Sequence, residues 1–338
     1  MNPAVNRIAY AAAHVAAGAD HRIDWDTTLR FRHHLWSLGL GVADAMDTAQ
    51  RGMGLEWPDC AELIRRSGAE ARAAGGLLCC GAGTDQLTGP TDLAGIVRAY
   101  EEQVAVVEEA GARVVLMCSR ALAATATGPE DYHAVYARLL EQVSEPVILH
   151  WLGPMFDPAL DGYWGSEEAL LALVTRYAGK VDGIKLSLLD ADREVAFRRA
   201  LPPGVRLYTG DDFHYPELIR GDEHGYSDAL LGVFDPIAVP AAAALRALNA
   251  GEVAEYDRLL APTVPLARQL FAAPTWHYKT GIAFLAWLAG HQDRFAMVGG
   301  YETARSREHL EELYALAGPA GVLPDPELAA DRMKEWRG

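Results

Sequence analysis

The sequence predicts an α/β fold, a (β/α)8 TIM barrel with a C-terminal helical appendix. Short apolar runs alternate with longer amphipathic stretches, a pattern typical of repeated βα units around a parallel sheet. Eight such apolar runs precede residue 238, which is close to the length of about 250 residues typical of this barrel. We therefore expect the barrel over residues 1–237 and a helical region packed on it over residues 238–338.

Each expected strand is a short apolar run bounded by turn residues, as in strands that are buried on both faces. The eight expected strands are Ile8–His14, Gly41–Thr48, Gly76–Gly81, Arg113–Cys118, Pro146–Leu152, Val181–Ser187, Val205–Gly210 and Ala229–Phe234. Three of the four cysteines, Cys79, Cys80 and Cys118, fall in or at the end of these apolar runs without metal-ligand spacing, so we interpret them as structural residues, and we expect no disulfide framework.

The expected helices fill the longer stretches between the strands and the whole C-terminal part. Asp24, Asp92 and Ser166 precede three of them and supply acceptors for the free amides of the first turn. The expected barrel helices are Thr27–Leu38, Pro58–Ala74, Leu93–Ala110, Pro129–Val143, Glu167–Tyr177 and Ala191–Ala200. The expected C-terminal helices are Ala238–Ala250, Gly251–Phe271, Lys279–Ala289 and Ser306–Leu316.

Composition and charge exclude several classes of protein. The net charge is −16 and the 30 basic residues are scattered along the chain, so we expect no nucleic-acid partner. No apolar window approaches 18 residues, and the segment Met1–Arg7 does not resemble a secretory signal. The sequence therefore predicts a cytoplasmic protein with no membrane partner.

Lys185 lies within the apolar run Val181–Ser187, where an unpaired ammonium is rare. A desolvated lysine has a lowered pKa, and a neutral amine in a pocket is the nucleophile that forms a Schiff base with a carbonyl compound. The alternative is a lysine at a strand end that reaches solvent or pairs with a carboxylate. This strand alone does not decide between the two interpretations.

Polar residues gather at the carboxyl ends of the expected strands, where the active sites of such barrels lie. The residues are His14, Asp47, Thr48, Ser119, Arg120, His150, Lys185, Ser187, Asp211, Asp212 and Asp235. Strand periodicity places Lys185 and Ser187 on the same face as Gly183, and His150 on the inward face of the preceding strand. We therefore expect the amine and the imidazole to meet across one pocket.

The stretches Val181–Lys185 and Leu207–Asp212 resemble the dihydrodipicolinate synthase / N-acetylneuraminate lyase family of class I aldolases. In that family a Gly-Ile-Lys strand carries the Schiff-base lysine, and a Gly-Asp-Asp-like segment follows on the next strand. Pro146–Trp151 and Leu78–Thr84 resemble two further strands of the family, and Tyr278–Ile282 resembles part of its C-terminal helical region. The resemblance implies the TIM barrel, a lyase activity without a cofactor, and a homo-oligomer, either a dimer or a tetramer.

Matched to the family, Lys185 aligns with the imine-forming lysine and Thr48 with a threonine of the loop that grips a carboxylate. His150 stands in place of the family's proton-relaying tyrosine. Asp47 departs from the glycine-rich loop and would repel a carboxylate unless Arg51 or Arg120 compensates. Clustered carboxylates instead suit a hydroxyl-rich ligand such as a keto sugar or polyol, because they accept several hydrogen bonds.

The first hypothesis is therefore a class I aldolase, lyase or dehydratase that acts on a small hydroxylated carbonyl compound such as a keto acid or keto sugar. Lys185 forms the imine and His150 relays protons. The imine serves as the electron sink, so no cofactor and no metal are required. The expected substrate-binding residues are Asp47, Thr48, Ser119, Arg120, Ser187, Gly210, Asp211 and Asp212.

Two alternatives remain open from the sequence. A metal-dependent barrel such as a sugar isomerase or epimerase would draw its ligands from His14, Asp47, His150, Asp211 or Asp235, although no tight ligand spacing occurs. A non-catalytic ligand-binding barrel is the other, since fold does not fix function. That alternative would be favoured if Lys185 were salt-bridged to a carboxylate with no pocket above it.

Overall fold

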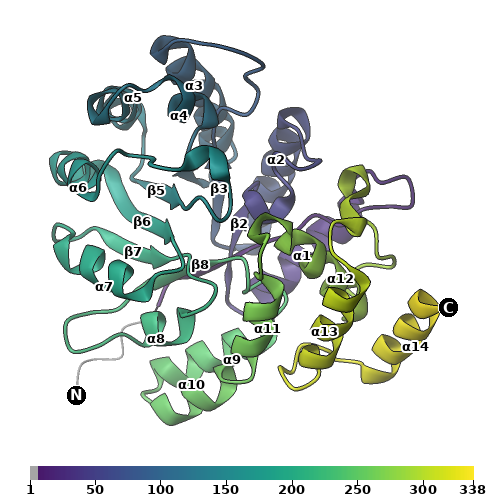
Figure 1. The fold of residues 1–338 in the computed structure, drawn as a ribbon. Helices are drawn as coiled ribbons and strands as arrows, with labels where there is room; N and C mark the ends of the chain where they lie inside the picture. The colour runs from purple at the N-terminus through teal and green to yellow at the C-terminus, as the bar shows by residue number, and fades with distance from the viewer. Residues whose placement is uncertain (1–6) are drawn as a thin grey trace.

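The computed structural model describes residues 7–338 and confirms the predicted barrel (Figure 1). Residues 1–6, which carry most of the segment compared with a secretory signal, lie outside the described part. Eight strands pair in parallel and in sequence order, and the eighth closes on the first. The strands are β1 (Ala9–Ala12), β2 (Gly41–Asp44), β3 (Leu78–Ala82), β4 (Arg113–Leu116), β5 (Val147–Leu152), β6 (Val181–Ser187), β7 (Arg206–Thr209) and β8 (Asp228–Leu231).

Helices surround the barrel and continue beyond it. Within the barrel they are α1 (Trp25–Ser37), α2 (Trp57–Ala74), α3 (Leu93–Glu109), α4 (Arg120–Thr125), α5 (Pro129–Gln142), α6 (Glu167–Arg176), α7 (Ala191–Ala200) and α8 (Tyr215–Arg220). After β8 they are α9 (Ala238–Asn249), α10 (Val253–Leu260), α11 (Thr263–Leu270), α12 (Tyr278–Leu288), α13 (Arg307–Ala317) and α14 (Pro326–Arg337). The predicted caps are confirmed: Asp24, Asp92 and Ser166 each accept a backbone N–H in the first turn of their helix.

One expected helix is in fact two. The stretch Gly251–Phe271 breaks between α10 and α11 at Ala261 and Pro262. Proline has no backbone N–H to continue the hydrogen-bonding pattern, and its ring clashes with the preceding turn. The break turns α11 back along the barrel, so that it packs against α13.

The strands place side chains on two sides, as their alternation predicts. Ile148 and Tyr208 belong to a small apolar cluster inside the barrel. Leu149, Ile184 and Leu186 belong instead to the large cluster between the strands and the helices. The faces expected for the strands that carry His150 and Lys185 are therefore correct.

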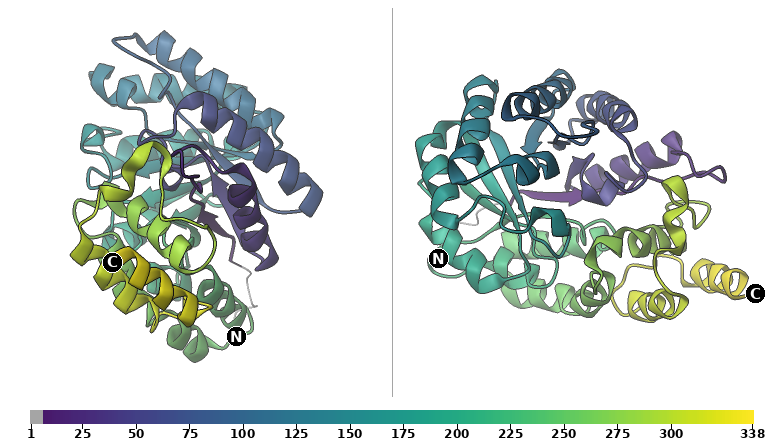
Figure 2. Two further views of the ribbon diagram at one scale, coloured as in Figure 1. Left: turned by 90° about the vertical axis from the view of Figure 1, so that its right-hand side faces the viewer. Right: turned by 45° about the horizontal axis from the view of Figure 1, so that its top comes forward.

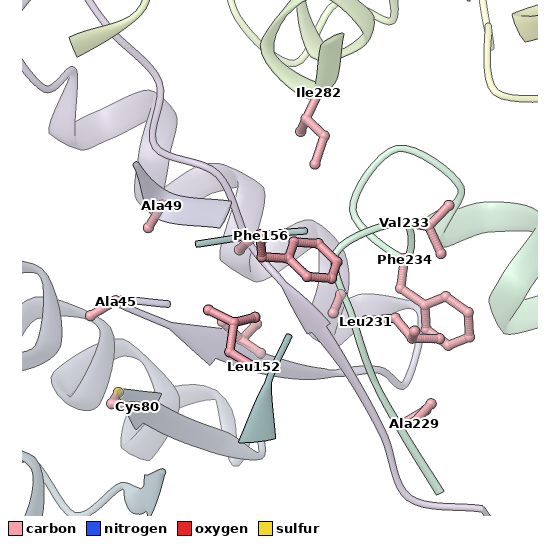
Figure 3. Close-up of a cluster of buried hydrophobic side chains, with 14 of the residues drawn as sticks. Ala45, Ala49, Cys80, Leu152, Phe156, Ala229, Leu231, Val233, Phe234 and Ile282 are labelled. Atoms are coloured by element: carbon pink, nitrogen blue, oxygen red, sulfur yellow. The ribbon is translucent and has the colours of Figure 1, made fainter. Parts of the chain in front are cut away.

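The helices after β8 form a layer along one side of the barrel (Figure 2). Every residue of α12 is buried, which fits a helix enclosed by protein on all sides. Figure 3 shows Ile282 of α12 above a cluster that contains Phe156, Val233 and Phe234. The amino-terminal end of α12 thus reaches the rim at which the strands end.

A buried ion pair joins the first helix to the second strand. Arg32 of α1 and Asp44 of β2 are both completely buried, and Arg32 Nη2 donates to Asp44 Oδ1 over 2.8 Å. Arg32 also donates to the carbonyl oxygens of His14 and Thr28, and Asp44 accepts from Ser67 Oγ. These bonds satisfy both charges, as burial requires.

Glu194 of α7 is buried against β7, and within residues 7–338 it forms no ion pair. Its two oxygens accept hydrogen bonds from Ser227 Oγ and Thr209 Oγ1. Burial raises the pKa of Glu194 to about 8, so the folded protein binds a proton that the unfolded chain releases near pH 4.5. Stability therefore falls as pH rises from about 4.5 towards 8.

Replacement of Glu194 by glutamine removes the titrating group and therefore the loss of stability between pH 4.5 and 8. It keeps a side chain of the same shape between the hydroxyls of Ser227 and Thr209. We expect Glu194→Gln to raise the free energy of unfolding by roughly 3 kcal/mol at pH 8 and to change it little at pH 4. Urea unfolding at the two pH values measures this difference, with the exposed Glu145→Gln as the matched control. Equal stabilisation at both pH values would contradict the protonation argument.

Among the helices of residues 7–338, none combines the length and the apolar character needed to cross a bilayer.

Candidate functional site

Lys185 faces a small cavity inside the carboxyl-terminal rim of the barrel. The cavity has a volume of about 10 Å³, which is room for about one water molecule. Its lining combines residues that follow several strands with one residue of α12. The lining residues are Met46, Asp47, Thr48, His150, Leu152, Phe156, Lys185, Ser187, Asp212, Gly232 and Tyr278.

Lys185 is buried, with 8% of its surface exposed. Burial lowers the pKa of Lys185, and the negative charges of Asp212 and Asp47 only partly oppose this effect. Within residues 7–338 no carboxylate lies within ion-pairing distance of its amine: Asp47 pairs with Lys279 and Asp211 bonds to His214. The lysine is therefore poised to lose its proton, as a nucleophilic amine must.

His150 lies opposite Lys185 in the pairing of β5 with β6, so both side chains project into the barrel. Its Nε2 lies 3.2 Å from Ser187 Oγ, and its Nδ1 is buried without a hydrogen-bond partner among the described residues. Burial lowers the pKa of His150 well below the usual range, and the nearby Lys185 adds to the effect. The imidazole is thus neutral at physiological pH.

Asp212 lies in the segment between β7 and β8, and its Oδ1 accepts a hydrogen bond of 2.8 Å from the amide of Val233. Burial raises the pKa of Asp212 to about 7, although the Val233 amide and the charge of Lys185 act in the opposite direction. A carboxyl group that titrates near neutrality therefore shares the cavity with the lysine.

Asp47 forms an ion pair with a second buried lysine, Lys279, beside the cavity. Lys279 of α12 is 3% exposed, and its Nζ lies 3.0 Å from Asp47 Oδ1. The other oxygen, Asp47 Oδ2, is buried and accepts no hydrogen bond from the described residues. Lys279 thus balances Asp47, a role for which the sequence had suggested Arg51 or Arg120 as candidates.

Neither arginine is available for that role. The guanidinium of Arg51 donates to Asp85, Gln103 and the carbonyl oxygen of Gly81. Arg120 is largely exposed, and its Nε lies 2.5 Å from Asp157 Oδ2. Neither guanidinium compensates Asp47, because both are bound to other carboxylates.

Thr48 completes one wall of the cavity through an aromatic side chain. Its Oγ1 lies 2.9 Å from the hydroxyl of Tyr278, whose ring stacks on Phe271 with centroids 4.5 Å apart. Burial raises the pKa of Tyr278 well above its usual range, so the phenol stays protonated. Phe156 packs edge-on against the same ring.

An outer pocket of about 310 Å³ lies beyond the cavity. Asp47 and Leu152 line both spaces and form the wall between them. The charged residues of the outer pocket are Asp47, Arg51, Glu56, Asp85, Arg120 and Asp157. With four carboxylates and two guanidinium groups, the outer pocket has an excess of negative charge.

The structure brings most of the predicted site residues together. Gly210 adjoins the cavity, because an added Cβ there would lie 3.0 Å from Lys185 Cε. Three residues point elsewhere, and one of them, Arg120, is the exposed partner of Asp157. Ser119 caps α4 and bonds to Thr84. Asp211 accepts the amides of Phe213 and His214 and bonds to the His214 ring.

Gly210 has no space for a side chain. A Cβ would clash with Ser187 Oγ and with the carbonyl oxygen of Leu186, as well as crowding Lys185. We expect Gly210→Ala to destabilise the protein by about 1–3 kcal/mol and to slow the reaction of the Lys185 amine with an added carbonyl probe by at least about tenfold. Urea unfolding and borohydride trapping measure the two effects. Gly179→Ala is the matched control, since nothing lies within 4 Å of its added Cβ; equal trapping by both variants would contradict the prediction.

The ligand types expected of a metal-dependent barrel are dispersed. His14 and Asp235 bond to each other, with His14 Nδ1 2.7 Å from Asp235 Oδ2. Across residues 7–338, no three histidine, cysteine, aspartate or glutamate side chains are arranged to hold a metal ion. The described geometry therefore gives no specific support to that alternative.

Sequence reasoning missed the contribution of α12 to the site. Tyr278 and Lys279 lie more than 90 residues beyond Lys185, and we expected no catalytic or binding role for them. The signal was the segment Tyr278–Ile282, which resembles part of the family's C-terminal region. Lys279 lies in this segment and is buried like Lys185, so the reasoning applied to a buried Lys185 applies to it as well.

Among solved structures, barrels of the dihydrodipicolinate synthase family are similar in fold to this one. A prophage protein of that family from E. coli K12, solved with pyruvate, has a TM-score of 0.74 and 16% identity over 94% of this chain and 99% of that one. Dihydrodipicolinate synthase from Acinetobacter baumannii, also solved with pyruvate, has a TM-score of 0.72 and 17% identity over 94% and 100%. The enzyme from Aquifex aeolicus has a TM-score of 0.71 and 13% identity over 94% and 99%. At these identities the likeness shows the fold.

Two sequence comparisons add to this result. A family model described as "Protein of unknown function (DUF993)" matches residues 1–337. No curated protein matches the sequence.

Proposed function

This chain belongs to the DUF993 family and has a barrel similar to those of dihydrodipicolinate synthases, and from these findings we propose that it is a Schiff-base-forming lyase. Lys185 forms the imine with a small hydroxylated carbonyl compound, such as a keto acid or keto sugar. The reaction is a cleavage or a dehydration of the aldolase type. The imine itself acts as the electron sink.

The observation that carries the proposal is a buried lysine that has no counter-ion among the described residues, in a cavity at the carboxyl-terminal rim of the barrel. Desolvation is not balanced by an ion pair, so the amine is held towards its neutral form. The condition that would have favoured a non-catalytic barrel is not met within the described residues, because Lys185 is not salt-bridged and a cavity lies above it.

The distribution of lysine and arginine along the chain also supports the proposed role of Lys185. Of the 30 lysine and arginine residues, only four are lysines, and two of those, Lys185 and Lys279, are buried at this site. Guanidinium groups remain protonated and cannot form an imine, whereas an amine can. A chain that uses arginine almost everywhere thus has lysine where amine chemistry is proposed.

The polar lining favours a substrate with hydroxyl groups. Asp47 Oδ2 is a buried acceptor without a donor, and Thr48 and Ser187 add hydroxyl groups to the same cavity. A substrate hydroxyl that donates to Asp47 would satisfy that oxygen. The acidic outer pocket disfavours a second anionic group there.

Borohydride trapping tests the proposal directly. The protein is incubated with pyruvate, dihydroxyacetone and D-fructose in parallel, reduced with borohydride, digested and mapped by peptide mass. Because the chain has four lysines, Lys180, Lys185, Lys279 and Lys334, each adduct is assigned to one side chain. We expect an adduct on Lys185 that is absent from Lys185→Ala and retained in Lys279→Met. No adduct with any probe, or an adduct confined to another lysine, would refute the proposal.

A further inference from the structure

Imine formation and carbon acid chemistry both require a proton carrier beside Lys185. We propose that Asp212, rather than His150, is the group that donates and accepts these protons. This inference rests on the proposed Schiff-base function and assigns a catalytic role to a residue that we first expected only to bind substrate.

The placement of Asp212 fits this role. The carboxyl group is 4% exposed and lines the same cavity as Lys185. The hydrogen bond from the Val233 amide to Oδ1 fixes its orientation, which a proton-transfer group needs if it is to meet its target at a defined angle.

His150 lacks the means to act as an acid. Its Nε2 faces the Ser187 hydroxyl, which can donate to it, and its Nδ1 has no described partner that would hold a proton in place. Burial and the adjacent amine keep the pKa of His150 well below neutrality. The geometry instead makes His150 a positioning residue for Ser187, on the strand next to the lysine.

Asp212 is also the group near the amine that titrates in the useful range. The ionisable groups that influence it or that it influences are Lys185 on β6, Asp211 beside it, Tyr215 on α8 and Tyr278 on α12. Burial raises the pKa of both tyrosines above the usual range, and Asp211 is bonded to His214. Asp212, with a pKa of about 7, and Lys185 therefore share the proton that moves near neutral pH.

The Asp212 carboxyl group can act both in imine formation and in the later removal of a proton from carbon, and each step balances in atoms and charge. The neutral Lys185 amine attacks the carbonyl carbon, and protonated Asp212 gives its proton to the departing oxygen. The products are a protonated imine, one water molecule and the Asp212 carboxylate. The carboxylate then removes a proton from the carbon next to the imine, the electron pair moves into an enamine, and Asp212 is protonated again.

Deuterium exchange separates this proposal from the one before it. Pyruvate and dihydroxyacetone are incubated with the protein in D2O, and loss of the protons next to the carbonyl is followed by NMR between pH 5.5 and 8.5. For the wild type we expect the exchange rate to rise through a midpoint near pH 7. For Asp212→Asn we expect a rate at least about 100-fold lower at pH 8 and no such rise.

Trapping and a histidine variant complete the design. Borohydride trapping after long incubation reports the imine at equilibrium, so Asp212→Asn is expected to keep its Lys185 adduct, which also shows that the variant is folded. His150→Gln is expected to keep the rise near pH 7. If the wild type gives no Lys185 adduct, the proposed function fails and this inference with it. If the adduct forms but Asp212→Asn keeps the wild-type pH profile, or His150→Gln loses it, this inference alone is overturned.

Discussion

Lys185→Ala is expected to reduce turnover by at least about 1,000-fold, because the amine proposed to carry the covalent intermediate is lost. Steady-state assay of retro-aldol or dehydration products, on the carbonyl compound that gives the trapped adduct, measures the loss. Activity within about tenfold of the wild type would contradict a covalent mechanism at this residue. Lys185→Arg is expected to fail equally, since a guanidinium stays protonated.

A second variant at position 185 is expected to show that burying the Lys185 amine lowers the stability of the folded protein. The pKa of Lys185 is lowered by burial, so the folded state disfavours the charged form that the unfolded chain has at neutral pH. Lys185→Met, which fills a similar volume without the amine, is therefore expected to unfold at an equal or higher temperature than the wild type. Thermal unfolding at pH 7 checks this; a lower melting temperature would mean that the lysine stabilises the fold.

Asp44→Ala is expected to destabilise the protein by about 3–5 kcal/mol, because it leaves the buried guanidinium of Arg32 without its counter-charge. The loss reaches the site as well as the fold. Asp44 ends β2, three residues before Asp47, and Arg32 holds the carbonyl oxygen of His14 at the end of the neighbouring strand. Urea unfolding gives the free energy, and the rate of trapping at Lys185 gives the effect on the site.

A double variant separates an unpaired charge from a lost contact. Arg32→Met combined with Asp44→Ala removes both charges and is expected to be more stable than Asp44→Ala alone. If the double variant is as unstable as the sum of its two single variants, the pair contributes through packing and not through charge compensation.

The repeating pattern of the chain was enough to predict the barrel. Each strand is a short apolar run, and the period of two determines which side chains enter the barrel, so the inward positions of His150 and Lys185 follow from the sequence. The break at Pro262 was visible in the sequence as well, but the amphipathic pattern on both sides of it concealed the proline's effect.

The finer geometry of the site depends on contacts that no local pattern encodes. Asp211 and Asp212 are adjacent and look equivalent in the sequence. In the structure, the turn that follows β7 directs Asp211 to the amides of Phe213 and His214 and directs Asp212 into the cavity. Lys279 likewise meets Asp47 only because α12 folds back onto the rim. Tertiary packing, which sequence periodicity does not describe, decides both.

The position of α12 determines when the site is completed during synthesis of the chain. The helix supplies Tyr278 and Lys279 to a cavity whose lysine was synthesised some 90 residues earlier, and both side chains contact the loop that follows β2. A nascent chain that has completed its eight strands has Lys185 in place but lacks the cation that neutralises Asp47 and the phenol that anchors Thr48. The site is thus completed only after α12 has been synthesised and has docked, and until then the amine of Lys185 lacks the part of its enclosure that α12 provides.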